Sequence, residues 1–196
     1  MIFNENRLTG IRPEVQEAVR AIAQRTENEL KRNITVSEGF RTFAVQEAYY
    51  AQGRKGLEEV NALRKKAGLP AITKKQNQKI VTYAPAGTSA HNVSAAVDIY
   101  LLTADNKSLE SNTAMLTKFF AIVSEEVLKR KDTVVWGGHW KDFKDMPHIE
   151  YKHYRSLIKN NPVVSNDKNN TDNTDNTDNT LLILGAVVLM GLVLLS

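Results

Sequence analysis

The sequence predicts an α+β domain over residues 1–164, with a small antiparallel sheet and helices on one side of it. Segments in which apolar residues recur with helical spacing precede and interrupt short β-branched runs. The two kinds of segment do not alternate regularly, as they would in a parallel α/β fold. The chain has 196 residues and no cysteine. A body of this length buries a hydrophobic core without disulfide bonds.

Four helices are expected. Pro13 suits the first turn of a helix, and Thr42 suits an N-cap position. Gly53 is a natural stop for the second helix. The third helix lies inside a Lys-rich surface insertion, residues 54–79. The expected helices are Pro13 to about Leu30, Thr42 to about Gly53, Leu57–Lys66 and Thr113–Lys129.

Short β-branched and aromatic runs predict the strands of the sheet. The turn-forming sequence Pro85-Ala86-Gly87 separates the second predicted strand from the third. The expected strands are Ile34–Val36, Ile80–Tyr83, Ala95–Leu101, Thr133–Trp136 and His148–Tyr151.

Two segments of different composition follow the domain. Residues 165–180 are rich in Thr, Asp and Asn and have no apolar side chain to bury, so a disordered spacer is predicted. Residues 181–196 begin with fifteen uncharged, apolar residues, Leu181–Leu195. A bilayer span needs about 20 such residues, so this run is short for a transmembrane helix.

The apolar run nevertheless predicts a C-terminal helix that inserts into a membrane as a transmembrane segment, while the domain before it stays soluble, because the run is apolar all round. Packing on another protein and self-association are the alternatives. No Lys or Arg flanks the run directly, so the sequence indicates no orientation in the membrane.

Charge divides unevenly along the chain. The whole chain carries a net charge of +4, and the segment from Ser165 onward contributes −3, so the body before it carries +7. A basic body favours anionic partners. No RNA-binding aromatic motif or basic helix is present, and nucleic acid is therefore not an expected partner.

Histidine and aspartate supply the candidate metal ligands, because the chain has no cysteine. Taken singly, each His is more often an ordinary core or surface residue. His91 and Asp98 flank a stretch of small residues, and His148 follows Asp145 by three positions. Two His and one carboxylate leave a zinc position open for water, and a further carboxylate can take its proton. Spacing alone leaves a zinc site and isolated residues both open.

Five stretches of the chain stand out together as motifs. They are Gly10-Ile11-Arg12-Pro13-Glu14-Val15, Ser37-Glu38-Gly39-Phe40-Arg41-Thr42 with Gln46 and residues 50–54, Gly87-Thr88-Ser89-Ala90-His91 to Ala96-Val97-Asp98, Trp136-Gly137-Gly138-His139-Trp140, and Asp145-Met146-Pro147-His148-Ile149-Glu150. In this order they resemble the zinc peptidases of the D-alanyl-D-alanine carboxypeptidase and L-alanyl-D-glutamate peptidase family, which includes many phage endolysins. The resemblance covers about residues 8–152.

The resemblance implies a zinc site on the sheet and a role for each matching residue. The metal ligands fall on His91, Asp98 and His148. The catalytic carboxylate falls on Asp145. The remaining implied roles are substrate or oxyanion contact for Arg41 and groove-lining positions for Ser89 and Gln46.

Some side chains keep two interpretations. Arg41 also fits a structural ion pair, and Trp140 fits either a core position or the wall of the substrate groove. His139 and His153 have no partner in a motif and are predicted not to bind the metal. Relatives usually carry Gly where this chain has Ser94, which leaves the conformation of that loop open.

The expected activity is hydrolysis of peptidoglycan stem peptides. The endopeptidases of this family that cut between L-alanine and D-glutamate carry an Asp, rather than a Glu, three residues before the last metal-binding His. Asp145 stands in that position relative to His148, so it favours that bond. One alternative is a D,D-carboxypeptidase that trims terminal D-alanine. Another is a catalytically silent wall-binding module that keeps zinc for folding, which would need neither Asp145 nor Arg41.

Overall fold

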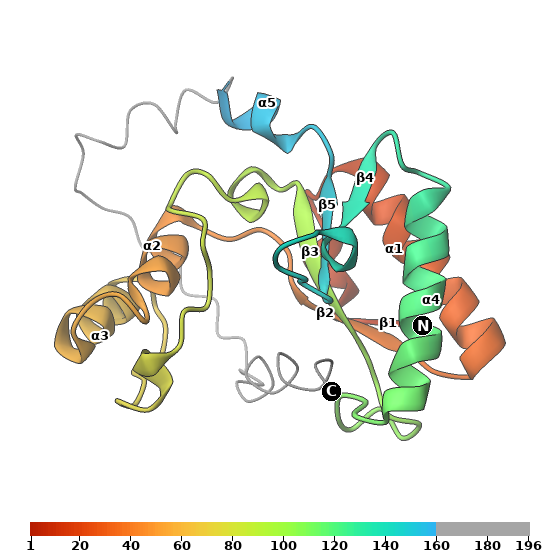
Figure 1. Cartoon of the computed structure of the whole chain (residues 1–196), viewed down its shortest axis with the longest axis horizontal. Helices are drawn as coiled ribbons and strands as arrows, with labels where there is room; N and C mark the ends of the chain where they lie inside the picture. The colour runs from red at the N-terminus through yellow and green to blue at the C-terminus, as the bar shows by residue number, and fades with distance from the viewer. Residues whose placement is uncertain (160–196) are drawn as a thin grey trace.

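The structure, a computed structural model, describes residues 1–159, and a five-stranded sheet lies at its centre. The strand order is β1-β2-β3-β5-β4 (Figure 1). The strands are β1 (Ile2–Phe3), β2 (Ile34–Glu38), β3 (Ala96–Leu101), β4 (Val134–Trp136) and β5 (His148–Tyr151).

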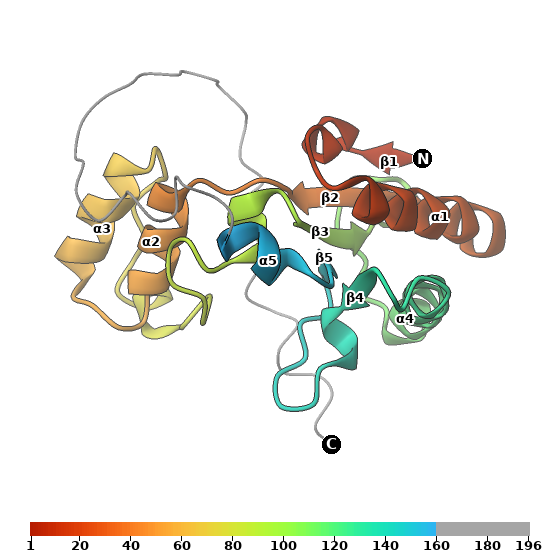
Figure 2. The same cartoon turned by 90° about the horizontal axis from the view of Figure 1, so that it is seen from above.

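Two long helices, α1 (Pro13–Leu30) and α4 (Thr113–Leu128), cover one face of this sheet. They contact each other, and both contribute to a single hydrophobic core with the strands. Figure 2 shows the two helices on the same side of the molecule. The predicted helices at these positions, and the α+β class, are therefore confirmed.

The alternation of side chains along the strands leaves the other face of the sheet free for polar groups. Val97 and Ile99 on β3, and Ile149 on β5, belong to the core beneath the helices. Since successive side chains of a strand point to opposite faces, Asp98 and His148 lie on the face away from α1 and α4.

A separate lobe, formed by α2 (Phe43–Ala51) and α3 (Leu57–Lys66), lies beyond the end of the sheet (Figure 1). The Thr42 hydroxyl accepts a hydrogen bond of 3.3 Å from the Val45 N–H, which is the predicted N-cap. The last described helix, α5 (Tyr154–Lys159), was not expected from the sequence.

Two sheet predictions are wrong. The sheet is mixed rather than antiparallel, because β1 pairs with β2 in parallel. The connection between them contains α1, which brings the chain back to start β2 in the direction of β1. A strand of two residues gives no periodicity from which this pairing could be read.

The predicted strand Ile80–Tyr83 is also absent from the sheet. Its segment lies against the α2–α3 lobe, where side chains satisfy its backbone: Arg54 Nη1 donates to the Thr82 carbonyl at 3.0 Å. A Cβ on Gly53 would lie 2.8 Å from the Ile80 nitrogen, so the chain passes directly over the end of α2.

The predicted spacer, residues 165–180, and the predicted membrane segment, residues 181–196, lie outside the described residues. Within residues 1–159, every helix is too short or too polar to span a bilayer.

A buried ion cluster joins α1 to α4 and gives a test of the fold. Glu126, 3% exposed, accepts from Arg25, Lys129 and Arg130 at 3.1, 2.6 and 2.9 Å. Burial opposes the charged carboxylate, but these hydrogen bonds outweigh it and lower the pKa of Glu126 to about 2. Because the folded pKa is depressed, the cluster stabilises the fold above about pH 4.5, and this contribution is lost as pH falls from there toward 2.

We therefore expect Glu126→Gln to lower the free energy of unfolding at pH 7 by about 1–3 kcal/mol, because three donors lose a charged acceptor. The difference from wild type should shrink between pH 4.5 and pH 2. Urea unfolding followed by circular dichroism, with a chelator present, measures both. Glu125→Gln is the matched control: its side chain is 60% exposed, so it should cost no more than about 1 kcal/mol. Equal losses in the two variants would contradict the role of Glu126.

Candidate metal centre

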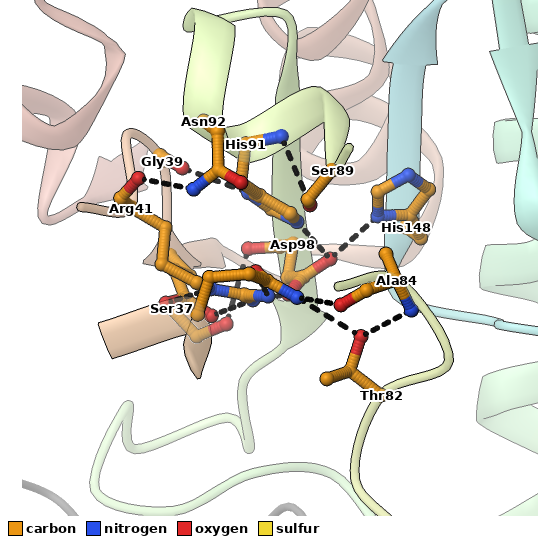
Figure 3. Close-up of polar contacts among 12 residues, drawn as sticks. Ser37, Gly39, Arg41, Thr82, Ala84, Ser89, His91, Asn92, Asp98 and His148 are labelled. Atoms are coloured by element: carbon orange, nitrogen blue, oxygen red, sulfur yellow. Dashed lines mark hydrogen bonds and ion pairs between the residues drawn. The ribbon is translucent and has the colours of Figure 1, made fainter. Parts of the chain in front are cut away.

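Three predicted ligands meet on the open face of the sheet. Asp98 on β3 and His148 on β5 are register partners, and His91 comes from a 3-10 helix, Ala90–Val93, that precedes β3. Asp98 Oδ1 lies 3.1 Å from His148 Nδ1 and 3.6 Å from His91 Nε2 (Figure 3). One ligand atom from each residue lies within 4.8 Å of the others, so the three can hold one metal ion.

The backbone around His91 is tightly fixed. Its Nδ1 donates to the Gly39 carbonyl at 2.8 Å, and its N–H donates to Ser89 Oγ at 3.3 Å. A Cβ on Gly39 would lie 2.2 Å from the Arg7 carbonyl oxygen, so only glycine fits there. These contacts turn His91 Nε2 toward Asp98.

Ser94 adopts the left-handed conformation that glycine favours. Its φ is 53° and its ψ is 33°. The loop between His91 and Asp98 therefore keeps the glycine-type turn despite the serine, and the ligands on either side of it still converge.

Glu150 holds His148 from the far side of its ring. The two residues alternate with Ile149 on β5 and share one face of the sheet. His148 Nε2 donates to Glu150 Oε2 at 3.1 Å, and Nδ1 faces Asp98. A His with one nitrogen engaged by a carboxylate presents the other to a metal in a fixed orientation. The sequence analysis did not predict that Glu150 orients His148. The signal was present, because two residues separated by one position on a strand point to the same face.

The buried carboxylates of the site are stabilised by positive charge next to them. Burial opposes charge on Asp98, but His91 and His148 outweigh it and hold the pKa of Asp98 well below its ordinary value. Burial likewise opposes the imidazolium form of His148, but hydrogen bonds to Asp98 and Glu150 raise its pKa to about 10. Without a metal, a proton on His148 thus supplies the positive charge that these carboxylates require.

Arg41 lies beside the triad, held by other side chains. It forms a two-pronged ion pair with Glu38, with Nε at 2.7 Å from Oε1, and its Nη1 donates to Gln46 Oε1 at 2.8 Å. Its Nη2 lies 3.9 Å from Asp98 Oδ2. A β-bulge between Val36 and Glu38 aligns Glu38 with Asp98, which places the Glu38 carboxylate on the site face.

Asp145 is positioned by the turn that precedes β5. Its N–H donates to the Gly137 carbonyl at 3.2 Å, and a Cβ on Gly137 would lie 2.4 Å from the Asp145 carbonyl oxygen. Burial raises the pKa of the Asp145 carboxyl above its ordinary value, and the nearby Asp98 carboxylate adds to this effect. A raised pKa makes this carboxylate a better proton acceptor than an exposed aspartate.

The remaining predicted residues surround these groups. The Trp140 ring lies 5.4 Å from the His148 ring, centroid to centroid. Ser89 caps the helix that carries His91, and Gln46 is fully buried against Arg41. His139 bonds to Ser124 and His153 to the Asp132 carbonyl, so neither joins the triad.

The donor set fits zinc. Two imidazoles and one carboxylate, with a fourth position left for water, are the ligands of catalytic zinc sites in peptidases. Among residues 1–159, these three form the only group of His, Asp and Glu side chains placed to hold a metal.

Comparison with known proteins agrees with this site. Residues 82–151 match a family model described as D-alanyl-D-alanine carboxypeptidase. Over 123 residues the chain is 34% identical to the peptidoglycan L-alanyl-D-glutamate endopeptidase CwlK of Bacillus subtilis (strain 168). That match covers 60% of this chain and 60% of the relative, less than two thirds of its length. The family resemblance seen in the sequence is confirmed.

Two solved structures are also similar. The L-Ala D-Glu endopeptidase ChiX of Serratia marcescens has a TM-score of 0.47 at 22% identity, over 81% of this chain and 94% of that chain. The LD-carboxypeptidase LdcB has a TM-score of 0.38 at 16% identity, over 76% of this chain and 64% of that chain.

We expect His148→Ala to abolish tight zinc binding, because it removes one of three proposed ligands and the 3.1 Å contact that His148 makes with Asp98. Isothermal titration calorimetry with zinc, and metal content after dialysis, measure the change. The control is His153→Ala, which removes an exposed imidazole outside the triad and should leave zinc affinity unchanged. Full zinc occupancy in His148→Ala would contradict the ligand assignment.

Proposed function

We propose that this chain is a zinc-dependent peptidase that hydrolyses the peptide stem of peptidoglycan. The observation that carries the proposal is the convergence of His91, Asp98 and His148 on one point, next to the carboxylate of Asp145. The curated relative, at 34% identity, is named as a peptidoglycan endopeptidase and supports the same substrate.

The bond that we propose lies between L-alanine and D-glutamate. The name of the curated relative supports this bond, and so does the aspartate at position 145. The description of the matching family model supports a second candidate, removal of terminal D-alanine. The two activities differ in their products and in whether a free carboxyl terminus is required.

Each residue of the site has a part in this chemistry. Bound Zn²⁺ supplies Lewis acidity and lowers the pKa of a water molecule toward neutrality. Asp145 accepts a proton from the attacking water and passes it to the leaving amine. Its raised pKa favours the first transfer, because the carboxylate takes up a proton more readily than an exposed aspartate does.

Arg41 combines the two interpretations that the sequence left open. Three of its N–H groups bond to Glu38 and Gln46, so it is anchored as a structural ion pair. We propose that its Nη2 group, which faces Asp98, orients that ligand and provides positive charge next to the developing oxyanion.

Digestion of purified sacculi by the full chain should release stem fragments that begin with D-glutamate, leaving L-alanine on the glycan. Mass spectrometry of the soluble and insoluble products identifies the bond. Loss of D-alanine alone, and only from stems with a free carboxyl terminus, would favour the carboxypeptidase activity. No release of peptide with zinc present would contradict the proposed function.

Asp145→Asn tests whether Asp145 acts as the general base rather than as a zinc ligand. Loss of a general base typically lowers the rate about 10²- to 10⁴-fold, and zinc should remain bound because Asp145 is not a proposed ligand. A parallel fall in zinc content and activity would mean that Asp145 acts as a ligand instead.

We also propose that the chain associates with a membrane through residues 181–196. The support is sequence alone: Leu181–Leu195 carries no charge, and its side chains are almost all aliphatic. The Thr-, Asp- and Asn-rich stretch before it would separate that contact from the catalytic domain.

Membrane association is tested by flotation. The full chain should rise with vesicles of mixed zwitterionic and anionic lipid in a density gradient, whereas residues 1–164 should stay at the bottom. Zinc content and peptide release of the two proteins should be equal. Flotation of the shorter protein would contradict anchoring by residues 181–196.

A further inference from the structure

Three exposed aromatic side chains lie in segments that adjoin site residues. Among the described residues, seven large hydrophobic side chains are exposed, and the aromatic ones are Phe40, Tyr83 and Phe143. Phe40 precedes Arg41, Phe143 precedes Asp145 by two residues, and the neighbours of Tyr83 bond to Gln46. Exposed apolar surface concentrated next to a polar site is typical of a ligand-binding surface.

Tyr83 and Phe143 are the central pair of this surface. Their rings meet edge to face, with centroids 5.5 Å apart and planes at 70°. Tyr83 remains 65% exposed and Phe143 54% exposed, so the contact does not bury them. In an edge-to-face pair one ring presents only its edge, so the partner ring does not cover its faces. The Arg54 guanidinium carbon lies 5.8 Å from the Tyr83 centroid, over one face of that ring, which leaves the opposite face to a ligand.

The position of Tyr83 relative to the metal ligands is fixed by its neighbours. Gln46 Nε2 donates to Thr82 Oγ1 at 3.2 Å and to the Ala84 carbonyl at 2.7 Å. The same Gln46 bonds to Arg41, which faces Asp98. Dashed lines in Figure 3 join Thr82 and Ala84 to the network of polar contacts around Asp98.

Phe143 reaches the pair from the other side of the site. It precedes Asp145 by two residues, in the segment that connects Trp140 to β5. The Trp140 ring in turn lies against His148. The pair therefore joins the segment after the α2–α3 lobe to the segment that carries the catalytic carboxylate.

We propose that Tyr83 and Phe143 form a subsite that stacks on a sugar ring of the peptidoglycan glycan strand. This inference rests on the proposed function. The side chains flanking the scissile bond are a methyl group and a carboxylate, and neither presents a flat apolar face. The L-alanine is attached through a lactyl ether directly to an N-acetylhexosamine, so a sugar lies one residue from the bond. The C–H groups on one face of a pyranose give the flat apolar surface that an aromatic ring binds.

The test compares two soluble substrates with the same stem peptide, one attached to its disaccharide and one without sugar. The enzyme is the full chain with zinc, and products are quantified by chromatography and mass spectrometry. We expect Tyr83→Ala and Phe143→Ala to raise KM for the disaccharide substrate about 3- to 10-fold, with kcat nearly unchanged. Tyr83→Phe keeps the ring and should retain the wild-type KM.

Matched controls separate stacking from a structural role. Leu128→Ala removes a side chain of the same exposure as Phe143, 54%, at the end of helix α4. It should leave KM unchanged for both substrates. KM for the sugar-free peptide should change less than twofold in every variant. Equal effects on both substrates, or a fall in kcat on both, would overturn the sugar subsite and assign the pair to holding the site loops.

Failure of the inference is distinguishable from failure of the proposed function. If wild type cleaves both substrates with the same KM, the sugar subsite is overturned and the peptidase activity stands. If it cleaves neither, the proposed function fails and the inference fails with it. Loss of self-association or vesicle binding in the double variant, with both KM values unchanged, would assign the aromatic pair to another occupant and overturn the proposal.

Discussion

The pairing of Asp98 with His148 across β3 and β5 is the constraint on which the site depends. The two residues are register partners, and their side chains meet at 3.1 Å on the open face of the sheet. A slip of one residue would send His148 into the core and bring Ile149 into the site. Burial of Ile149 opposes such a slip of β5 by roughly 2 kcal/mol, and burial of Val97 and Ile99 opposes the same slip of β3 by roughly 2 kcal/mol for each side chain. The hydrophobic core thus fixes the geometry of the three side chains that could hold a metal.

The same site gathers negative charge that the core cannot compensate. Asp98, Glu150 and Asp145 lie around His148, and Arg41 is already paired with Glu38. With a pKa raised to about 10, His148 carries a proton at neutral pH when no metal is present. A metal ion that binds Nδ1 has to displace this proton, so the two cations compete for one position.

Much of this arrangement could be predicted from sequence, because the ligand motifs are local. The strand that carries Asp98, the strand that starts at His148 and the Thr42 cap each follow from short patterns. The predicted strand Ile80–Tyr83 is wrong because β-propensity does not reveal that the Arg54 side chain takes the Thr82 carbonyl as its hydrogen-bond acceptor.

The partners of the ligands were harder to predict than the ligands themselves. Glu38 reaches Arg41 only because a β-bulge shifts the register of β2, and a bulge leaves no mark in the hydrophobic pattern. The orientation of the Gln46 side-chain amide follows from its neighbours in the structure and not from the sequence. Arginine can only donate and a carbonyl can only accept, so Oε1 must face Arg41 and Nε2 must face Ala84. A flipped amide would lose both bonds inside a fully buried site. Gln46 therefore locks the 82–84 segment to the charged centre, and α2 sets the distance between the exposed Tyr83 and the ligand Asp98.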